Sequence, residues 1–435
     1  MENTSSLKAG IVGVGFAGGF HLESLQRVRG IPIEIAGCTS SHAETREAFA
    51  EKHGIRAFEN VEDLISVCDV VDVCTPPYAH EDVTVKAARA GRHVIVEKPF
   101  TGSFLNREKY SQLDQPAGTF CEERYREAVT SAQRMVEAVQ ASNTLLCFAE
   151  NWHFLPSGLK TCRLMMRSMH RKSRLEDGNW NEGEIDPGAR VMLIRGVEAH
   201  SGSSSPVYGD LQYAGGGAIV GKACHPLGFA LYLKRLEGIV RNGRPIAPEA
   251  VSCRCGYLTS NAEYETPDYR NNRKVRAGYV DGEDYAALFV RFQDGTFAQV
   301  ESNEFTLGGV NNVFEVLSNK FRVRSNLSPN ESLVAYSPSA EVFEPEHIVA
   351  KLGTPGGWSL PAFAENFTLG YIEEMQVFAE RIAAHRSGGE YTATPPYLPP
   401  EQDLELALDS VKVMYAGYVS DERNGAEVEL SSLDA

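Results

Sequence analysis

KAGIVGVGFAGGFH, residues 8–21, decides the fold, because an apolar run passes here through three glycines into a helical pattern. Gly13, Gly15 and Gly18 form a G-x-G-x-x-G motif directly after a strand expected at 8–13. The first glycine allows a tight turn, the second lets a pyrophosphate approach the backbone, and the third allows close packing of helix on strand. The helix N-terminus then faces the anion. The motif predicts a dinucleotide site, and the alternative is a glycine-rich turn without a ligand.

Alternating strand and helix patterns continue from this motif to about residue 150. We expect strands at 8–13, 33–38, 70–75, 93–97 and 144–150, and helices at 18–29, 42–53, 80–91 and 122–141. Near-continuous apolar strands separated by helices predict a parallel, doubly wound sheet with right-handed crossovers. This α/β domain is expected to occupy residues 1–149.

Residues 101–128 interrupt the alternation, because they are less regular and about twenty residues longer than such a connection needs. They leave from the edge of the sheet where ligands bind in this architecture. We therefore expect an insertion that forms a lid over the site, or otherwise an oligomer contact.

The texture of the sequence changes from about residue 190 onward. Alternating runs predict strands and hairpins, and FVRFQDGTFAQV is the clearest, with a turn at Asp294–Gly295. Helices are expected at 157–170, 223–236, 371–386 and 401–419, and a polar loop at 171–189. The second domain, residues 150–435, is therefore expected to be α+β with a mainly antiparallel sheet.

The composition narrows the classes of function. A chain of 435 residues is long for one domain, so two are expected. The net charge of −16 argues against nucleic-acid or anionic-membrane partners. We see no apolar run of transmembrane length and no signal peptide at the N-terminus. The nine cysteines lack C-x-x-C pairs, so reduced thiols in the cytoplasm, and no metal site, are predicted.

Two further stretches lie at the predicted ligand edge of the sheet. The second strand ends in Thr39, Ser40 and Ser41 without the carboxylate that often binds the ribose, so both NAD and NADP remain open. Their alternative role is to cap the next helix. TPPYAH follows the third strand, where Thr75–Pro77 form a rigid turn.

HVIVEKPF, residues 93–100, ends the fourth strand with Glu97, Lys98 and Pro99. Charged side chains are costly to bury unless they are paired. A lysine at the carboxyl edge of the sheet is expected to face a ligand, and its alternative is a salt bridge with Glu97.

GVGFAG, TPPYAH and VEKPF, in this order after successive strands, resemble the glucose-fructose oxidoreductase / inositol dehydrogenase / MocA family. The resemblance continues in NWHFLP (151–156), where the family often has N-R-R-F-x-P. It continues also in GGGAIVGKACHPL (215–227), where the family commonly has G-G-G-x-x-x-D-x-x-x-H.

The resemblance implies a Rossmann domain and a second domain with a large open, mainly antiparallel sheet, and an active site between them. Lys98 would contact the substrate hydroxyl, His225 would take its proton, and Glu97 would help hold the cofactor side of the site. The alternative for His225 is a core histidine. The Lys98–Pro99 bond would be cis. The predicted cofactor contacts are Gly13, Val14, Gly15, Phe16, Ala17, Thr39, Ser40, Ser41, Thr75, Pro76, Pro77, His80, Glu97, Lys98 and Asn151.

One position departs from the family pattern, because Gly221, followed by Lys222, stands where the family has an aspartate. Glu150 and Glu198 are candidates to replace that carboxylate. Lys222 would add positive charge, which suits an anionic substrate. The predicted substrate contacts are Lys98, Trp152, His153, Glu198, His200, Lys222 and His225.

Four of these contacts, Trp152, His153, Glu198 and His200, have a plain alternative. Trp152 and His153 would stack on and hydrogen-bond a sugar, or else pack between the domains. EAHSGSSSPVYGD (198–210), which contains His200, would form a substrate loop for a polyol, or else a flexible surface loop.

The leading functional hypothesis is an NAD(P)-dependent dehydrogenase that oxidises a hydroxyl of a sugar, cyclitol or glycoside. A second is a glycosidase that uses transient oxidation, elimination and re-reduction, and the missing aspartate keeps it open. A third is a non-catalytic nucleotide-sensing regulator, against which the presence of both Lys98 and His225 argues. A dimer or tetramer is expected, since a large open sheet leaves one face to cover.

Overall fold

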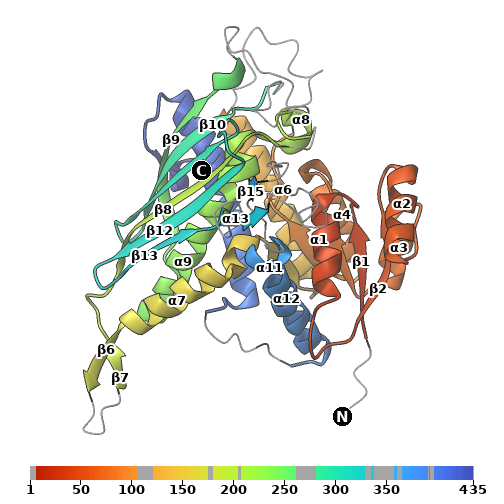
Figure 1. Ribbon diagram of the computed structural model, residues 1–435, viewed down its shortest axis with the longest axis horizontal. Coiled ribbons are helices and arrows are strands. Elements are labelled where there is room, and N and C mark those ends of the chain that lie inside the picture. The colour runs from red at the N-terminus through yellow and green to blue at the C-terminus, as the bar shows by residue number, and fades with distance from the viewer. Residues whose placement is uncertain are drawn as a thin grey trace.

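A computed structural model describes most of the chain and shows two principal sheets with helices between and beside them (Figure 1). The described residues are 6–104, 121–174, 180–203, 207–260, 281–328, 335–337, 357–359, 365–389, 391 and 396–434. Within these ranges, no helix combines the length and the apolar character that a membrane span requires.

The first sheet is parallel and has five strands in the order β2-β1-β3-β4-β5. Its strands are β1 (Leu7–Val12), β2 (Ile33–Thr39), β3 (Val70–Val73), β4 (His93–Glu97) and β5 (Leu146–Ala149). The helices that connect them are α1 (Phe16–Leu25), α2 (Ala43–His53), α3 (Val61–Val67), α4 (His80–Arg89) and α6 (Cys121–Ala141). The doubly wound parallel sheet expected from the sequence is therefore confirmed, and α3 is the helix that the sequence reading missed.

The pleat of this sheet sorts its side chains between two apolar clusters. Ile11, Val70 and Ile95 lie in one cluster, and their neighbours Val12 and Val71 lie in the other. Successive side chains of a strand point to opposite faces, so Asp72 and Glu97 share the face of Val70 and Ile95. That face is covered by α1.

The helix α12 (Tyr371–Arg386) covers the same face beside α1, although it lies near the other end of the chain (Figure 1). Met375, Phe378 and Ile382 are fully buried in the cluster that contains Ile11 and Ile95. A domain boundary at residues 149/150 stays a prediction, and α12 is one part of residues 150–435 that packs on the first sheet.

The second sheet has seven strands in the order β13-β12-β8-β11-β10-β9-β16. They are β8 (Val191–His200), β9 (Pro248–Gly256), β10 (Tyr285–Phe292), β11 (Phe297–Asn303), β12 (Val310–Ser318), β13 (Arg322–Asn326) and β16 (Val428–Glu429). Only β8 and β11 pair in parallel, so the mainly antiparallel sheet is confirmed. The hairpin expected at Asp294–Gly295 joins β10 to β11, with Gly295 at φ 76°.

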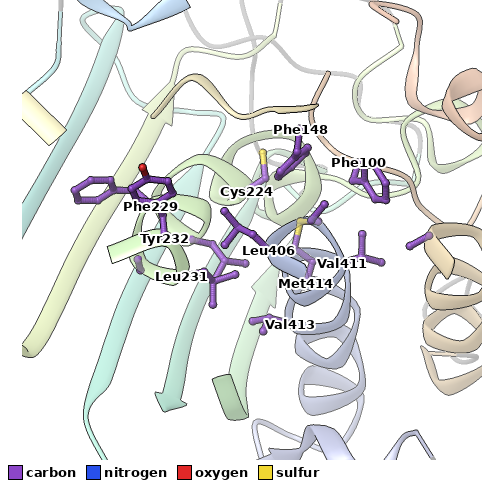
Figure 2. Packing of buried hydrophobic residues seen from close by; sticks show 14 of the residues in the cluster. Phe100, Phe148, Cys224, Phe229, Leu231, Tyr232, Leu406, Val411, Val413 and Met414 are labelled. Atoms are coloured by element: carbon purple, nitrogen blue, oxygen red, sulfur yellow. The ribbon is translucent and has the colours of Figure 1, made fainter. Parts of the chain in front are cut away.

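Two long helices, α9 (Cys224–Asn242) and α13 (Pro400–Glu422), connect the two sheets through a shared core. Figure 2 shows Phe100 and Phe148 from the parallel sheet's edge close to Cys224 of α9 and Leu406, Val411 and Met414 of α13. The first fifteen residues of α9 are buried, as expected of a helix enclosed on all sides. The start of α9 is thereby fixed relative to the end of β4.

The loop expected at 171–189 is wrong, because β6 (His170–Arg174) and β7 (Trp180–Ile185) form an antiparallel pair there. The pair projects from the body of the molecule (Figure 1), so no apolar alternation marks it in the sequence.

Residues 105–120, most of the expected insertion, lie outside the described residues, and 121–128 belong to α6. The remaining elements are η1 (Pro77–Ala79), η2 (Asn151–Phe154), α7 (Pro156–Ser168), α8 (Leu211–Ala214), η3 (Ile219–Ala223), η4 (Leu258–Ser260), β14 (Ala335–Ser337), β15 (Gly357–Ser359), α11 (Glu365–Thr368) and η7 (Leu430–Ser432).

Candidate active site

The glycine-rich loop joins β1 to α1 and fits a dinucleotide pyrophosphate. Gly13 has φ 101°, and a Cβ atom there would lie 2.5 Å from the carbonyl carbon of Cys74. A Cβ atom at Gly18 would lie 2.2 Å from the carbonyl oxygen of Gly13. At Gly15, in contrast, a Cβ atom would meet nothing within 4 Å. Two glycines thus hold the loop against its neighbours, while the third leaves open the approach to the N-terminus of α1.

The end of β2 carries no carboxylate beside the ribose position. Ser40 Oγ donates to the carbonyl of His42 at 3.2 Å, and Thr39 is buried. Ser41 is exposed, and the residue that caps α2 is His42, so the capping alternative is wrong for Ser41. Arg46 folds back from α2 and donates from Nη1 to the carbonyl of Ser40 at 3.1 Å. The guanidinium of Arg46 therefore lies close to the end of β2. The spacing of residues in the sequence had left open whether an arginine lies there.

His80 connects the two turns at the carboxyl edge of the sheet. Its Nε2 lies 2.9 Å from the carbonyl of Thr75, and its Nδ1 lies 3.0 Å from the carbonyl of Pro99. The imidazole is fully buried, and burial lowers the pKa of His80. His80 thus fixes the Thr75–Pro77 turn relative to the turn behind Lys98, and a direct cofactor contact of its side chain stays a prediction.

Glu97 lies in a buried chain of ionisable groups that the sequence reading did not foresee. His21 of α1 lies between two carboxylates, with Nε2 at 3.0 Å from Glu97 Oε1 and Nδ1 at 2.9 Å from Asp72 Oδ1. Burial opposes a charge on this imidazole, but the carboxylate of Asp72 and the nearby Cys74 hold the pKa of His21 well above its ordinary value. His21 is therefore an imidazolium that donates to both carboxylates, and it connects α1 to the end of β4.

Lys98 follows Glu97 in the chain, and the peptide bond between Lys98 and Pro99 is cis, as the resemblance implied. The alternative salt bridge with Glu97 does not form among the described residues, since Glu97 is bonded to His21. The ammonium lies 5.9 Å from the centre of the Tyr208 ring. Burial opposes its charge, but Tyr208, Cys224 and the acidic side chains around it hold the pKa of Lys98 well above its ordinary value.

His225 stands at the start of α9, between two buried glutamates. Its Nδ1 lies 2.6 Å from Oε1 of Glu150, and its Nε2 lies 4.0 Å from Oε1 of Glu198. Two glycines allow this close assembly, because a Cβ atom at Gly196 of β8 would lie 2.5 Å from Cβ of Pro226, and one at Gly228 would lie 2.9 Å from Cγ of Glu150. Glu150, one of the two candidates to replace the missing aspartate, is thus hydrogen-bonded to the histidine.

Burial sets the protonation of this pair. It lowers the pKa of His225 to about 3 and raises the pKa of Glu150 to about 7. The imidazole of His225 is therefore neutral near neutral pH, as a proton acceptor must be. The proton on Glu150 exchanges in the same pH range.

The other predicted substrate contacts are placed in three ways. Trp152 is buried and stacks on His225, with ring centres 6.0 Å apart, while His153 stacks on Tyr232 at 4.8 Å. Their packing in this structure is internal, and contact with a sugar stays a prediction. Glu198 and His200, two residues apart on β8, share one face and approach to 3.2 Å.

Asn151, a predicted cofactor contact, and Lys222, a predicted substrate contact, differ in their surroundings. Asn151 donates from its side chain to the carbonyl of Leu369 at 2.8 Å, which connects the site to the chain before α12. Lys222 lies in η3, a π-helical turn that runs directly into α9, and its ammonium lies 5.6 Å from the centre of the Tyr208 ring. Tyr208 lies in the predicted substrate loop 198–210 but was not named as a contact, because nothing in the sequence places residue 208 beside residues 98 and 222.

Among the described residues, two trios of side chains have potential ligand atoms within 4.8 Å of one another: His21, Asp72 and Cys74, and Glu150, Cys224 and His225. Burial raises the pKa of both thiols, Cys74 and Cys224. In this structure His21 and Asp72 are hydrogen-bonded to each other, and so are Glu150 and His225.

Comparison with known proteins agrees with this geometry. Residues 7–121 match the oxidoreductase family with an NAD-binding Rossmann fold that comprises glucose-fructose oxidoreductase, inositol dehydrogenase and MocA. The chain is 34% identical over 95 residues to UDP-N-acetylglucosamine 3-dehydrogenase of Acidithiobacillus ferrooxidans, covering 22% of this chain and 29% of that protein. It is 33% identical over 122 residues to inositol 2-dehydrogenase of Leifsonia xyli, covering 26% and 34%. The chain thus aligns with about a third of the length of these relatives.

Solved structures resemble nearly the whole chain. GenD2 from gentamicin A biosynthesis, in complex with NAD, has a TM-score of 0.69 at 20% identity, covering 99% of this chain and 97% of that one. Levoglucosan dehydrogenase, in complex with NADH and L-sorbose, has a TM-score of 0.63 at 17% identity, covering 98% and 99%. These likenesses show the fold alone.

The parallel sheet, the glycine loop and the matched segment define the first part of the chain as an NAD-binding Rossmann domain. Residues 7–121 thus match the family that the sequence motifs resemble, that of glucose-fructose oxidoreductase, inositol dehydrogenase and MocA.

Proposed function

We propose that this protein is an NAD(P)-dependent dehydrogenase that oxidises a hydroxyl of a sugar or cyclitol. One observation carries the proposal: Lys98, His225 and Glu150 gather at the carboxyl edge of the parallel sheet, the edge at which dinucleotides bind in this architecture. Several similar proteins are named as dehydrogenases of sugars and inositols, which supports the substrate class.

Oxidation of a carbinol removes a hydride from carbon and a proton from oxygen. The bound nicotinamide would accept the hydride. The ammonium of Lys98 would stabilise the developing alkoxide, because a positive charge placed before the reaction favours negative charge at that oxygen. Neutral His225 would take the hydroxyl proton on Nε2 while Glu150 holds Nδ1. Glu150 thereby orients the ring, as an acid beside a catalytic histidine does.

The first test is the variant Lys98→Ala, measured by the absorbance of reduced nicotinamide on a panel of sugars and cyclitols. We expect turnover to fall by about 10²- to 10⁴-fold, because a group that stabilises the transition state is removed. Cofactor affinity, measured by fluorescence titration, should change little. Lys160→Ala, which removes an exposed lysine of α7, is the control. Wild-type rates in Lys98→Ala would rule out the proposed role.

The same assays separate the alternatives. Steady formation of reduced cofactor from a sugar supports the dehydrogenase. Release of an aglycone from a glycoside without net reduction supports the redox-assisted glycosidase, which uses the same first step. Cofactor binding without turnover on the whole panel supports a nucleotide sensor.

A further inference from the structure

We propose that Lys222 and Tyr208 form a subsite for an anionic substituent, a carboxylate or phosphate, on the substrate. The inference rests on the proposed function, since it names the class of sugar that this site would accept. It concerns Lys222, a positive group of the site for which the proposed hydride and proton transfer has no use.

The acidic side chains around the site already have partners. Glu97 is bonded to His21 at 3.0 Å, and Glu150 is bonded to His225 at 2.6 Å. The third acid, Glu198, approaches His200 to 3.2 Å. The nearest charged or hydrogen-bonding partner of each of these three carboxylates is thus a histidine, and none of the three forms an ion pair with Lys98 or Lys222.

Neither lysine has one within the described residues. The ammonium groups of Lys98 and Lys222 form no ion pair within 4.0 Å and no hydrogen bond with any described group. Lys222 is only 8% exposed. A buried ammonium without a partner is costly, and an anionic ligand would offset that cost. Lys98 is committed to the reacting hydroxyl, so Lys222 is the group left to bind an anion.

Tyr208 and Gly221 give this subsite its shape. The ammonium groups of Lys98 and Lys222 lie 5.9 Å and 5.6 Å from the centre of the Tyr208 ring. A Cβ atom at Gly221 would lie 3.3 Å from Cδ1 of Tyr208, so the ring occupies the space that a larger side chain at 221 would need. The aspartate common at this position would also bring its own carboxylate beside Lys222. Glycine here therefore keeps the lysine available to a ligand.

The reacting hydroxyl and the anionic group would bind at the same ring. Beside the Tyr208 ring, Lys98 would contact the reacting hydroxyl and Lys222 would contact the anionic group. This arrangement predicts that the charged group belongs to the substrate molecule itself and lies near the oxidised carbon.

The test compares matched substrates with the full-length enzyme and either NAD⁺ or NADP⁺. The pairs are glucose 6-phosphate and glucose, glucuronate and glucose, and UDP-N-acetylglucosamine and N-acetylglucosamine. We expect kcat/KM for the charged member of at least one pair to exceed that of the neutral member by about 100-fold. The pair that responds identifies phosphate, carboxylate or diphosphate as the anion.

Two variants assign the preference to Lys222. Lys222→Gln is expected to raise KM for the charged substrate by about 10- to 100-fold, with kcat and the neutral substrate little affected. Gly221→Asp is expected to do the same by pairing with the lysine. Lys160→Gln is the matched control. Equal losses on charged and neutral substrates, or a wild-type preference for the neutral member of every pair, would overturn the inference.

A binding measurement separates this inference from the proposed function. Calorimetric titration of each pair onto the enzyme with reduced cofactor needs no turnover. Charge-selective binding that Lys222→Gln abolishes, without turnover, keeps the subsite and rejects the dehydrogenase. Turnover without charge selectivity keeps the dehydrogenase and rejects the subsite. Neither turnover nor binding on the whole panel rejects both.

Discussion

The proton between Glu150 and His225 decides which nitrogen of the imidazole can accept a proton from substrate. Ionised Glu150 accepts the Nδ1–H of His225, which leaves a lone pair on Nε2. Protonated Glu150 instead donates to Nδ1, and Nε2 then carries the hydrogen and cannot act as a base. Burial raises the pKa of Glu150 to about 7 and lowers that of His225 to about 3, so this change falls near neutral pH. Lys98, Glu198 and the buried His153 surround the pair and modulate the change.

We therefore predict that kcat/KM for alcohol oxidation rises with pH through a pKa near 7. In Glu150→Gln this limb of the pH profile should disappear, because the amide does not titrate, and activity at high pH should fall by about 10- to 100-fold. Glu301→Gln is the control and should keep the wild-type pH profile. Glu301 lies on β11, which pairs with β8, the strand that carries Glu198. A limb that survives unchanged in Glu150→Gln would assign it to another group.

His21 donates a hydrogen bond to each of two buried carboxylates and supplies the positive charge between them, so its removal should be expensive. We predict that His21→Leu lowers the free energy of unfolding by about 3–5 kcal/mol, because Asp72 and Glu97 would be left buried without a counter-charge. Both carboxylates would then bind protons more tightly in the folded than in the unfolded state. The loss should thus be smaller at pH 5 than at pH 6.5, since stability falls with rising pH when the folded state holds more protons.

Denaturant unfolding at the two pH values measures this loss. His53→Leu, a half-exposed imidazole of α2, is the matched control and should change stability little. A loss in His21→Leu that is independent of pH would mean that the carboxylates stay ionised without their partner.

Among the elements, contact between α9 and β8 places His225 against Glu198, and one glycine controls that contact. We predict that Gly196→Ala costs about 1–3 kcal/mol and displaces the start of α9, because the new methyl group would lie 2.5 Å from Cβ of Pro226. Activity should fall more than cofactor affinity, since the cofactor loop lies on another sheet. Gly188→Ala, where the nearest atom would be 3.4 Å away, serves as the control. Equal effects of the two variants would contradict the argument.

Local patterns predicted most elements, and contacts across the sequence accounted for what was missed. The glycine loop, the parallel strands and the Asp294–Gly295 turn each follow from a few neighbouring residues. The β6–β7 pair carried no apolar alternation to reveal it. His21 pairs with Asp72 and Glu97, which lie 51 and 76 residues away, and single-residue signals do not reach that far. Lys98, Glu150 and His225 were named from motifs, whereas Tyr208 was predicted only as part of the 198–210 loop, and its position beside Lys98 and Lys222 depends on tertiary structure.

At the scale of the whole molecule, the second sheet has one face packed on α9 and α13 and exposed apolar side chains on its strands, such as Met192, Phe289 and Phe297. Apolar side chains exposed on one face of a sheet favour association with a second copy of the chain. The expected dimer or tetramer stays a prediction. Sedimentation of the purified protein measures that state.

The return of α12 to the parallel sheet makes the two halves of the chain depend on each other. Phe378 is fully buried against Phe154 and the sheet, and Tyr371 stacks on Phe20 of α1 with ring centres 5.3 Å apart. The helix that carries the glycine loop is therefore supported by a segment that lies about 350 residues further along the chain. A boundary at residues 149/150 would separate that support from the cofactor site.

We predict that Phe378→Ala lowers the free energy of unfolding by about 3–5 kcal/mol, because a large buried ring leaves a cavity. Affinity for the reduced cofactor should fall with it, since α1 loses part of its packing surface. Phe289→Ala, which removes a ring that is 49% exposed on β10, should change neither quantity appreciably. Denaturant unfolding and fluorescence titration of both variants measure the two effects. Unchanged cofactor affinity in Phe378→Ala would show that residues 1–149 hold the cofactor without help from α12.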